Sequence, residues 1–367
     1  MRQISSIWSG LTKTILIKSG KKADVDCRRE ATDALVKEAT KNDMILRSPG
    51  VVIARDSDHL TSVFSKGGKK GVNQDCFIVW EEFGFQEDII FGGIFDGHGP
   101  WGHLVSKRVR KLMPSFLLCN WQETLSEAFL KLSGATPDKS DQSHIWKQAF
   151  FRTYSAIDQD LKRQNRIDTF HSGTTALTFV KQGNHIVIAN IGDSRAVLAT
   201  TDDEGSLMPI QLTIDLKPNL PQEASRIRQS KGRVFSAEDE PGVYRVWMPP
   251  NKQRNGSSGP GLAISRAFGD YFIKDFGLIS EPDFTMWNIN TSKDKFIILA
   301  TDGVWDVLSN EEAVQIVSST PEKEEAAKRL VERAVSAWKR KKRGYAMDDI
   351  SAICLFFQPT IENKKQS

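Results

Sequence analysis

Residues 89–99 read Ile-Ile-Phe-Gly-Gly-Ile-Phe-Asp-Gly-His-Gly, an apolar run that stops at Asp96. Other apolar runs of the chain are also bordered by aspartates, namely Asp193, Asp302, Asp75 and the pair Asp348–Asp349. Short apolar runs bounded by glycine and aspartate are typical of buried strands, so these carboxylates are expected at strand ends. Carboxylates gathered beside a core repel one another and lose hydration unless a cation compensates. The pattern therefore predicts a metal site.

The kind of metal follows from the proposed ligands, which are all oxygen donors. Such donors favour Mg²⁺ or Mn²⁺, whereas zinc and copper sites use cysteine or paired histidines. Calcium is disfavoured because the chain has no D-x-[DN]-x-[DN]-G loop. The cysteines stand far apart without CxxC spacing, which argues against a zinc site or a disulfide framework and favours a reducing compartment inside the cell.

The two residues after Asp96 suit a metal site. Gly97 would let a backbone carbonyl approach an ion closely, and His98 could shuttle a proton near neutral pH. Taken alone, Asp-Gly is also a common hairpin turn, and a lone histidine is more often a helix cap or simply exposed. An aspartate beside a glycine also follows an apolar run at 192–194 and at 301–303, and this repetition favours the functional interpretation.

The order of the expected elements predicts the fold class. Helical periodicity covers residues 101–116, 144–162, 220–232, 311–317 and 322–338, and strand-like runs cover 174–180, 185–190, 196–199, 296–300 and 350–357. Short glycine-containing turns between neighbouring strands favour antiparallel hairpins, so an α+β fold is expected. Residues 133–142 are expected to be a loop, and residues 234–261 an exposed flap near the site. Because the carboxylates span positions 75–349, one domain must contain them all.

Composition limits the possible functions. With 39% hydrophobic and 26% charged residues and a net charge of +4, the chain is expected to be an ordinary globular protein that does not bind nucleic acid. No apolar stretch approaches the length of a membrane span. The basic run at 339–343 could be a nuclear-localisation or anionic-partner patch, but a solvated helix end is the favoured interpretation.

Seven short motifs occur in the order found in one enzyme family. They are Asn73-Gln74-Asp75, Phe95-Asp96-Gly97-His98-Gly99, Ser172-Gly173-Thr174-Thr175-Ala176, Gly192-Asp193-Ser194-Arg195-Ala196, Ser265-Arg266-Ala267-Phe268-Gly269-Asp270, Ala300-Thr301-Asp302-Gly303-Val304-Trp305-Asp306 and Asp348-Asp349-Ile350-Ser351. On these motifs the chain resembles type-2C metal-dependent protein serine/threonine phosphatases, and it looks like a plant member. The resemblance covers roughly residues 51–357 and implies a four-layer α-β-β-α sandwich, with two antiparallel sheets flanked by helices.

This resemblance divides the chain into three parts. Residues 49–358 are expected to form the catalytic domain. Residues 1–48, which mix lysine, serine, aspartate and arginine and lead into the turn Ser48-Pro49-Gly50, are expected to be a partly disordered extension. Residues 359–367 are expected to be a polar tail.

The resemblance also implies a role for each matching residue. Asp96 would bridge two Mg²⁺ or Mn²⁺ ions, with the Gly97 carbonyl completing one of them and Asp302 and Asp348 holding the other. Asp75 would reach a metal through water, and Asp193 would help to hold a weaker third ion. His98 would be the general acid that protonates the leaving seryl or threonyl oxygen, so His98 and Asp75 are the expected catalytic residues.

The implied reaction is hydrolysis of phosphoserine and phosphothreonine by a metal-activated water at the dinuclear site, without a covalent enzyme intermediate. A phosphoaspartyl hydrolase is disfavoured because no DxDxT motif is present, and a metalloprotease because HExxH is absent. The rival from another class is an inactive phosphatase-like domain that binds phosphoproteins or scaffolds a kinase. The retained aspartates argue against it.

Two departures from the family pattern affect the site. Gln74 stands where relatives often carry an acidic residue, which removes one charge near the metals. Lys70, or its neighbour Lys69, falls where many relatives carry a phosphate-binding arginine, and lysine offers a point charge instead of a bidentate fork. The sequence leaves open which of the two lysines meets phosphate, and whether Asp348 or Asp349 is the metal ligand.

Expected partners are phosphoprotein substrates and protein kinases, without nucleic acid or a membrane span. The chain is expected to be a monomer in the cytoplasm, the nucleus or both. The substrate phosphoprotein and the signalling pathway cannot be derived from the sequence.

Overall fold

The structure, a computed structural model, describes residues 51–52, 60–86, 88–131, 139–238, 240–250, 260–342 and 344–357. These ranges contain every predicted site residue. The predicted extension at 1–48 and the tail at 359–367 lie outside the described residues, so the proposed domain boundaries stay predictions.

One sheet contains the run quoted first, which forms strand β4. Its six strands lie in the order β1-β3-β4-β7-β8-β14, with bounds β1 Val51–Val52, β3 Cys76–Trp80, β4 Ile89–Phe95, β7 Ala176–Gln182, β8 His185–Ile191 and β14 Asp283–Asn288. Neighbouring strands are antiparallel, except that β1 runs parallel to β3. Every residue of β4 is buried, since both faces of a central strand in a layered fold are covered.

The second sheet has five strands in the order β10-β9-β15-β16-β2, and all of its pairs are antiparallel. Their bounds are β10 Leu207–Gln211, β9 Arg195–Thr201, β15 Asp294–Ala300, β16 Ile350–Phe356 and β2 Leu60–Lys66. The two sheets share a core in which Ile90 and Ile188 of the first sheet belong to one cluster with Leu198 and Ile297 of the second. Burial of this apolar surface holds the sheets together.

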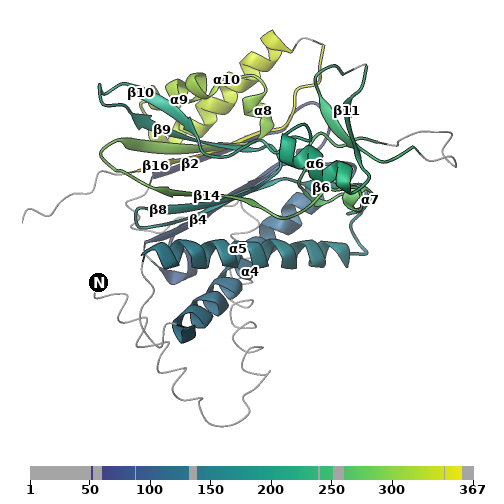
Figure 1. The fold of residues 1–367 in the computed structure, drawn as a ribbon. Helices are drawn as coiled ribbons and strands as arrows, with labels where there is room; N and C mark the ends of the chain where they lie inside the picture. The colour runs from purple at the N-terminus through teal and green to yellow at the C-terminus, as the bar shows by residue number, and fades with distance from the viewer. Residues whose placement is uncertain are drawn as a thin grey trace, which may run out of the picture. The chain divides into compact units, whose positions relative to one another are not determined.

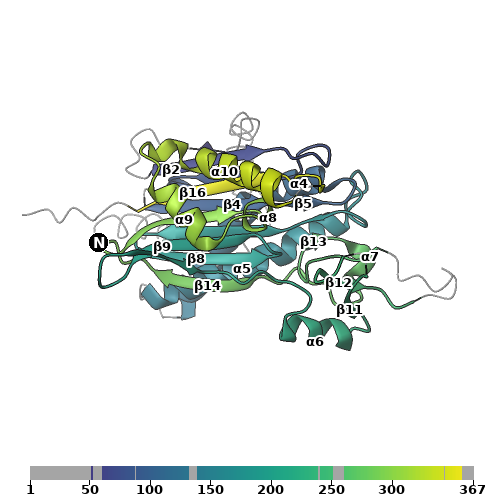
Figure 2. The same cartoon turned by 90° about the horizontal axis from the view of Figure 1, so that it is seen from above.

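Helices cover the outer face of each sheet, as Figures 1 and 2 show. Helices α4 (Gly102–Lys131) and α5 (Lys139–Lys162) lie on the first sheet. The second sheet is covered by α9 (Asn310–Ser318) and α10 (Ala326–Lys341), with the short α8 (Asp302–Trp305) and η3 (Lys323–Glu325) beside them. The predicted α-β-β-α layering is therefore confirmed.

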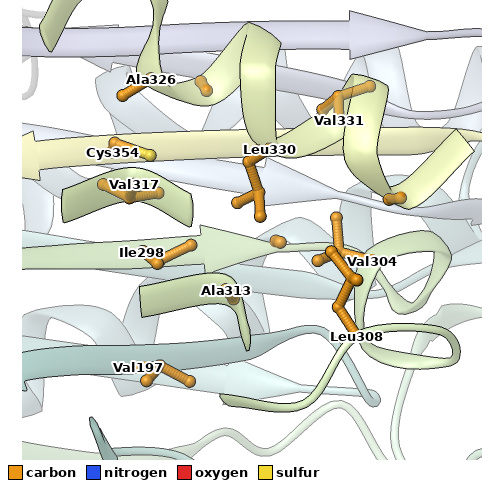
Figure 3. Close-up of a cluster of buried hydrophobic side chains, with 14 of the residues drawn as sticks. Val197, Ile298, Val304, Leu308, Ala313, Val317, Ala326, Leu330, Val331 and Cys354 are labelled. Carbon is orange, nitrogen blue, oxygen red and sulfur yellow. The ribbon is translucent and has the colours of Figure 1, made fainter. Parts of the chain in front are cut away.

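A large apolar cluster lies between the second sheet and its helices (Figure 3). Leu330 and Val331 of α10 and Ala313 of α9 belong to the same cluster as Ile298 of β15, and all four side chains are buried. Helix α9 begins at a capping box in which the Ser309 hydroxyl accepts from the Glu312 amide and the Glu312 carboxylate accepts from the Ser309 amide. This core fixes the end of β15, just before Asp302, and the start of β16, just after Asp348. Both aspartates are predicted metal ligands.

Several helix boundaries differ from the prediction. Helix α4 continues to Lys131, well past the predicted end at Phe116, and contains Pro114. Helix α5 begins at Lys139, so the loop predicted for 133–142 is wrong over its last four positions. The reason is that the apolar periodicity used to locate this helix starts only at Ile145, whereas its first residues are polar and leave no such pattern.

Short elements gather at one end of the sandwich, on the right of Figures 1 and 2. Strands β5 (Gly97–His98), β6 (Gly173–Thr174) and β13 (Phe268–Gly269) form a small sheet. Beside them lie α6 (Pro221–Gln229), α7 (Tyr271–Lys274) and a hairpin of β11 (Arg233–Ser236) and β12 (Tyr244–Trp247). Elsewhere, the short helix η1 (Phe83–Phe85) precedes β4 in the chain. Residues 233–247 of this region thus contain a hairpin, and its Val246 joins a small buried cluster with Ile227 and Ile264.

The basic run after Trp338 makes contacts within the domain. The Lys341 ammonium donates to the Val307 carbonyl at 2.7 Å, and Lys342 lies 5.7 Å from the centre of the Trp338 ring. Cations also stabilise the carboxyl end of a helix such as α10. These contacts favour the helix-end interpretation.

Among the helices that the structure describes, none is long and apolar enough to cross a membrane.

Candidate active site

A cavity of about 320 Å³ lies where strands of both sheets end. Apart from Asp75, all of the predicted site residues line it, namely Lys70, Asp96, Gly97, His98, Asp193, Asp302 and Asp348. One side, here called the carboxylate wall, consists of Asp96, Asp193, Asp302, Asp348 and Asp349. Another side, here called the flap wall, consists of Arg245, Leu262, Ala263 and Ile264. Residues far apart in the sequence therefore meet in one cavity, as the sequence predicted.

Asp96 is fixed by the turn from β4 into β5. Its amide donates to the Thr175 hydroxyl at 3.0 Å, and its carbonyl accepts from the Thr175 amide at 2.9 Å. The next residue must be glycine, because a Cβ on Gly97 would lie 2.5 Å from the Gly102 carbonyl oxygen and 2.7 Å from that of Gln74. The backbone around the proposed bridging ligand is thus held on both sides.

The carboxylate wall carries strong mutual repulsion. Loss of hydration raises the pKa of Asp96 well above its usual value, and the charges of Asp75 and Asp302 add to this effect. Loss of hydration also raises the pKa of Asp302 well above its usual value, with further contributions from Asp193 and Asp348. Such a cluster is costly in the charged state and would be relieved by a bound cation.

Asp75 lies behind this wall and is buried. Its Oδ2 accepts from the Thr301 hydroxyl at 3.0 Å, whereas its Oδ1 is buried without a hydrogen-bond partner among the described residues. Burial raises the pKa of Asp75 to about 7, aided by the charge of Asp349 and opposed by hydrogen bonds from Ser351 and Thr301. Since nearly all buried polar atoms have a partner, this oxygen is available to accept from a water or to bind an ion.

Two lysines pair with carboxylates of the wall. The Lys70 ammonium contacts Asp348, and the Lys217 ammonium contacts Asp193. Burial by itself would lower the pKa of Lys70, but the hydrogen bond and charge of Asp348 outweigh it and the pKa is raised. Lys217 could not be predicted from the sequence, because nothing in the local sequence shows that it meets a residue 24 positions earlier.

The geometry bears on the two alternatives that the sequence left open. Lys70 lines the cavity, whereas Lys69 is exposed outside it and contacts Met347 through its backbone amide. The two oxygens of Asp349 accept from the backbone amides of Gly68 and Gln74, at 2.7 and 2.8 Å. Lys70 and Asp348 are therefore the better candidates for phosphate and metal binding.

Two glycines hold the segment that carries Asp348. A Cβ on Gly68 would lie 2.3 Å from the Met347 carbonyl oxygen and 2.4 Å from the Asp348 carbonyl carbon. A Cβ on Gly303 would lie 2.1 Å from the Asp349 carbonyl oxygen. Backbone of residues 347–349 thus passes directly against two glycines, which leaves no room for a side chain.

His98 has a buried carboxylate partner. Its Nε2 lies 2.6 Å from Oδ2 of Asp270, whose side chain is 1% exposed. Burial by itself would lower the pKa of His98, but the charge and hydrogen bond of Asp270 outweigh it and the pKa is raised. Asp270 belongs to the motif at 265–270, but the sequence pattern alone indicates no role for it.

The donor set fits a hard divalent cation. It consists of carboxylate oxygens, one of them the unpartnered Oδ1 of Asp75, together with the Gly97 carbonyl. Within the described ranges, no group of three or more histidine, cysteine, aspartate or glutamate side chains is arranged to hold an ion. Asp193 and Asp348 instead contact Lys217 and Lys70, so binding an ion would require them to exchange a lysine for it.

Comparison with known proteins decides the family. A family model described as "Protein phosphatase 2C" matches residues 66–342. The chain belongs to this family. It is therefore a protein serine/threonine phosphatase, and its metal dependence follows from the family.

Relatives and solved structures agree with this assignment. Probable protein phosphatase 2C 34 of Arabidopsis thaliana is 58% identical over 97% of this chain and 98% of its own length. Probable protein phosphatase 2C 48 of rice (Oryza sativa subsp. japonica) is 50% identical over 97% and 99%. The crystal structure of serine-threonine phosphatase 2C from Toxoplasma gondii superposes with a TM-score of 0.73 at 25% identity, over 84% of this chain and 98% of that one. The expected plant-like family membership and fold are thus confirmed.

Proposed function

We propose that this phosphatase hydrolyses phosphoserine and phosphothreonine at a dinuclear Mg²⁺ or Mn²⁺ site on the carboxylate wall. Asp96 would bridge the two ions, with the Gly97 carbonyl on one and Asp302 and Asp348 on the other. Asp75 would act through water, and Asp193 would help to hold a weaker third ion. The observation that carries the proposal is the buried, unpartnered Oδ1 of Asp75 behind a cluster of mutually repelling carboxylates.

When bound, the ions supply positive charge that offsets the phosphate charge and activates the attacking water. Residues of the chain itself would bind the phosphate group and protonate the leaving oxygen. Lys70 would attract the phosphate group at the cavity mouth, since its side chain lines the cavity and is 55% exposed. As the bond between phosphorus and the seryl or threonyl oxygen breaks, the electron pair stays on that oxygen and His98 gives it a proton.

We also propose the cellular setting that the sequence favours. The family implies phosphoprotein substrates, and protein kinases are expected partners. A monomer in the cytoplasm, the nucleus or both fits the modest net charge and the widely spaced cysteines. Size-exclusion chromatography with light scattering tests the oligomeric state, and imaging of a tagged chain tests the location.

A metal titration tests the site. Activity on a phosphoserine peptide should be lost in EDTA and return with added Mg²⁺ or Mn²⁺, and calorimetry should show binding of two ions, with a third only at higher concentration. Asp302→Asn should weaken binding, whereas the matched surface variant Asp203→Asn should not, because Asp203 is 93% exposed and contacts only Lys293 among the residues described. Full activity after thorough chelation would contradict the proposal.

A further inference from the structure

Asp270, the hydrogen-bond partner of His98, is not one of the residues proposed to hold a metal ion. Asp270 is almost fully buried, while the His98 side chain is 26% exposed and lines the cavity. Their contact joins Nε2 of the ring to Oδ2 of the carboxylate at 2.6 Å, across 172 positions of sequence. Nδ1, the other ring nitrogen, makes no hydrogen bond within the described residues. One edge of the ring is therefore held, and the other is left for a ligand.

The small sheet is built around this contact. In its register, His98 of β5 faces Gly173 of β6, and Gly173 faces Gly269 of β13. A Cβ on Gly173 would lie 2.1 Å from Oδ2 of Asp270 and 2.7 Å from Nε2 of His98. The central strand must therefore carry glycine at this position, because the histidine and aspartate side chains occupy the space of its side chain.

The backbone at Asp270 is also unusual. Gly269 has a φ of +77° and Asp270 a φ of +53°, so both residues lie in the left-handed region. For a residue other than glycine this conformation costs about 1 kcal/mol. A backbone hydrogen bond from the Asp270 amide to the Ser172 carbonyl, at 3.1 Å, holds the turn in place. The strained backbone thus lies at the residue whose carboxylate contacts His98.

We propose that Asp270 is a positioning residue that fixes the ring of His98 through Nε2, so that Nδ1 faces the leaving seryl or threonyl oxygen, and that Gly173 is small to admit this pair. The inference rests on the proposed acid role of His98. In the step itself the oxygen of the attacking water bonds to phosphorus, and the bond between phosphorus and the seryl or threonyl oxygen breaks with its electron pair staying on that oxygen. The proton moves to this oxygen from Nδ1, and His98 regains a proton from solvent. Asp270 does not touch the substrate.

A leaving-group comparison tests the inference. An alkoxide leaving group needs a proton, whereas the anion released from p-nitrophenyl phosphate is stable without one. Asp270→Ala should therefore lower kcat on a phosphothreonine peptide by about tenfold or more, but on p-nitrophenyl phosphate by less than about threefold. Gly173→Ala should shift the same selectivity in the same direction, since the added methyl group overlaps the contact.

A double mutant separates positioning from general support of the fold. If Asp270 acts only through His98, adding Asp270→Ala to His98→Ala should cause no further loss on the peptide. The matched control is Asp294→Asn, because Asp294 is a buried aspartate whose hydrogen-bond partners, Thr200, Trp287 and Asn290, do not line the cavity. This variant should change the melting temperature without changing the ratio of the two activities.

The outcomes distinguish this inference from the function on which it rests. Equal losses on both substrates for His98→Ala would overturn the acid role and the inference together. A selective loss for His98→Ala but equal losses for Asp270→Ala, or additive losses in the double mutant, would overturn the inference alone. If Asp270→Ala does not fold, the isosteric Asp270→Asn decides, with a selective peptide loss of about threefold expected and no selectivity contradicting the proposal.

Discussion

The two walls of the cavity are built in different ways. The carboxylate wall takes Asp96 and Asp302 from the ends of seven-residue buried strands, and Asp348 from the approach to another. The flap wall rests on a hairpin of two four-residue strands with its own small apolar cluster. The first wall is continuous with the core of the sandwich, whereas the second is attached beside it. We therefore expect substitutions in the wall that continues the core to affect the chemistry, and substitutions in the flap wall to affect binding of the peptide.

The largest effects should come from the carboxylate wall. Asp96→Asn and Asp302→Asn should each lower kcat/KM by at least about a hundredfold, a loss of roughly 2.7 kcal/mol of transition-state stabilisation. Steady-state kinetics at saturating Mn²⁺, with Asp203→Asn as control, measures this. Turnover near that of the wild type in either variant would remove that aspartate from the ligand set.

Protons should compete with the metal on the same wall. Without a cation, the raised pKa of Asp75, about 7, means that its protonated form contributes stability below pH 4, and this contribution is lost as the pH rises through 7. Mg²⁺ should therefore bind about thirtyfold more weakly at pH 5.5 than at pH 8, and raise the melting temperature less. Calorimetric scans with and without Mg²⁺ check this. An equal increase in melting temperature at both pH values would contradict it.

Lys70 lines the cavity and should act in binding. Lys70→Ala should raise KM by about fivefold and lower kcat less, because an ammonium attracts the phosphate but cannot grip two of its oxygens in one plane. Lys69→Ala is the matched control, since Lys69 lies outside the cavity. If both single variants and the double variant leave KM within about twofold, the metals alone recognise the phosphate.

The flap wall should give the smallest effect. Leu262→Ala removes part of an apolar side chain that lines the cavity, so KM for a phosphopeptide should rise about threefold, and that for p-nitrophenyl phosphate should stay unchanged. Both substrates are compared in one assay. A loss of kcat on both, as large as that of Asp302→Asn, would show that the two walls do not divide the work.

The same contrast explains what the sequence predicted. Apolar runs ending at Asp96, Asp193 and Asp302 are local patterns, and they located the strand ends and the carboxylates correctly. Lys217 and Gly173 were missed because their importance depends on contacts with segments distant in the sequence. Helix ends and the flap hairpin were missed for a related reason, since polar first turns and short strands carry little periodicity.

The glycines that flank residues 347–349 have a consequence for how this enzyme can be switched off by mutation. Gly68 and Gly303 carry no functional group, yet any side chain at either would push against the backbone that presents Asp348. Selection for lost activity could thus act at positions that a survey of reactive side chains would pass over. A phosphatase-like sequence that keeps every aspartate but has a larger residue at Gly68 or Gly303 should not be counted among the active enzymes on its carboxylates alone.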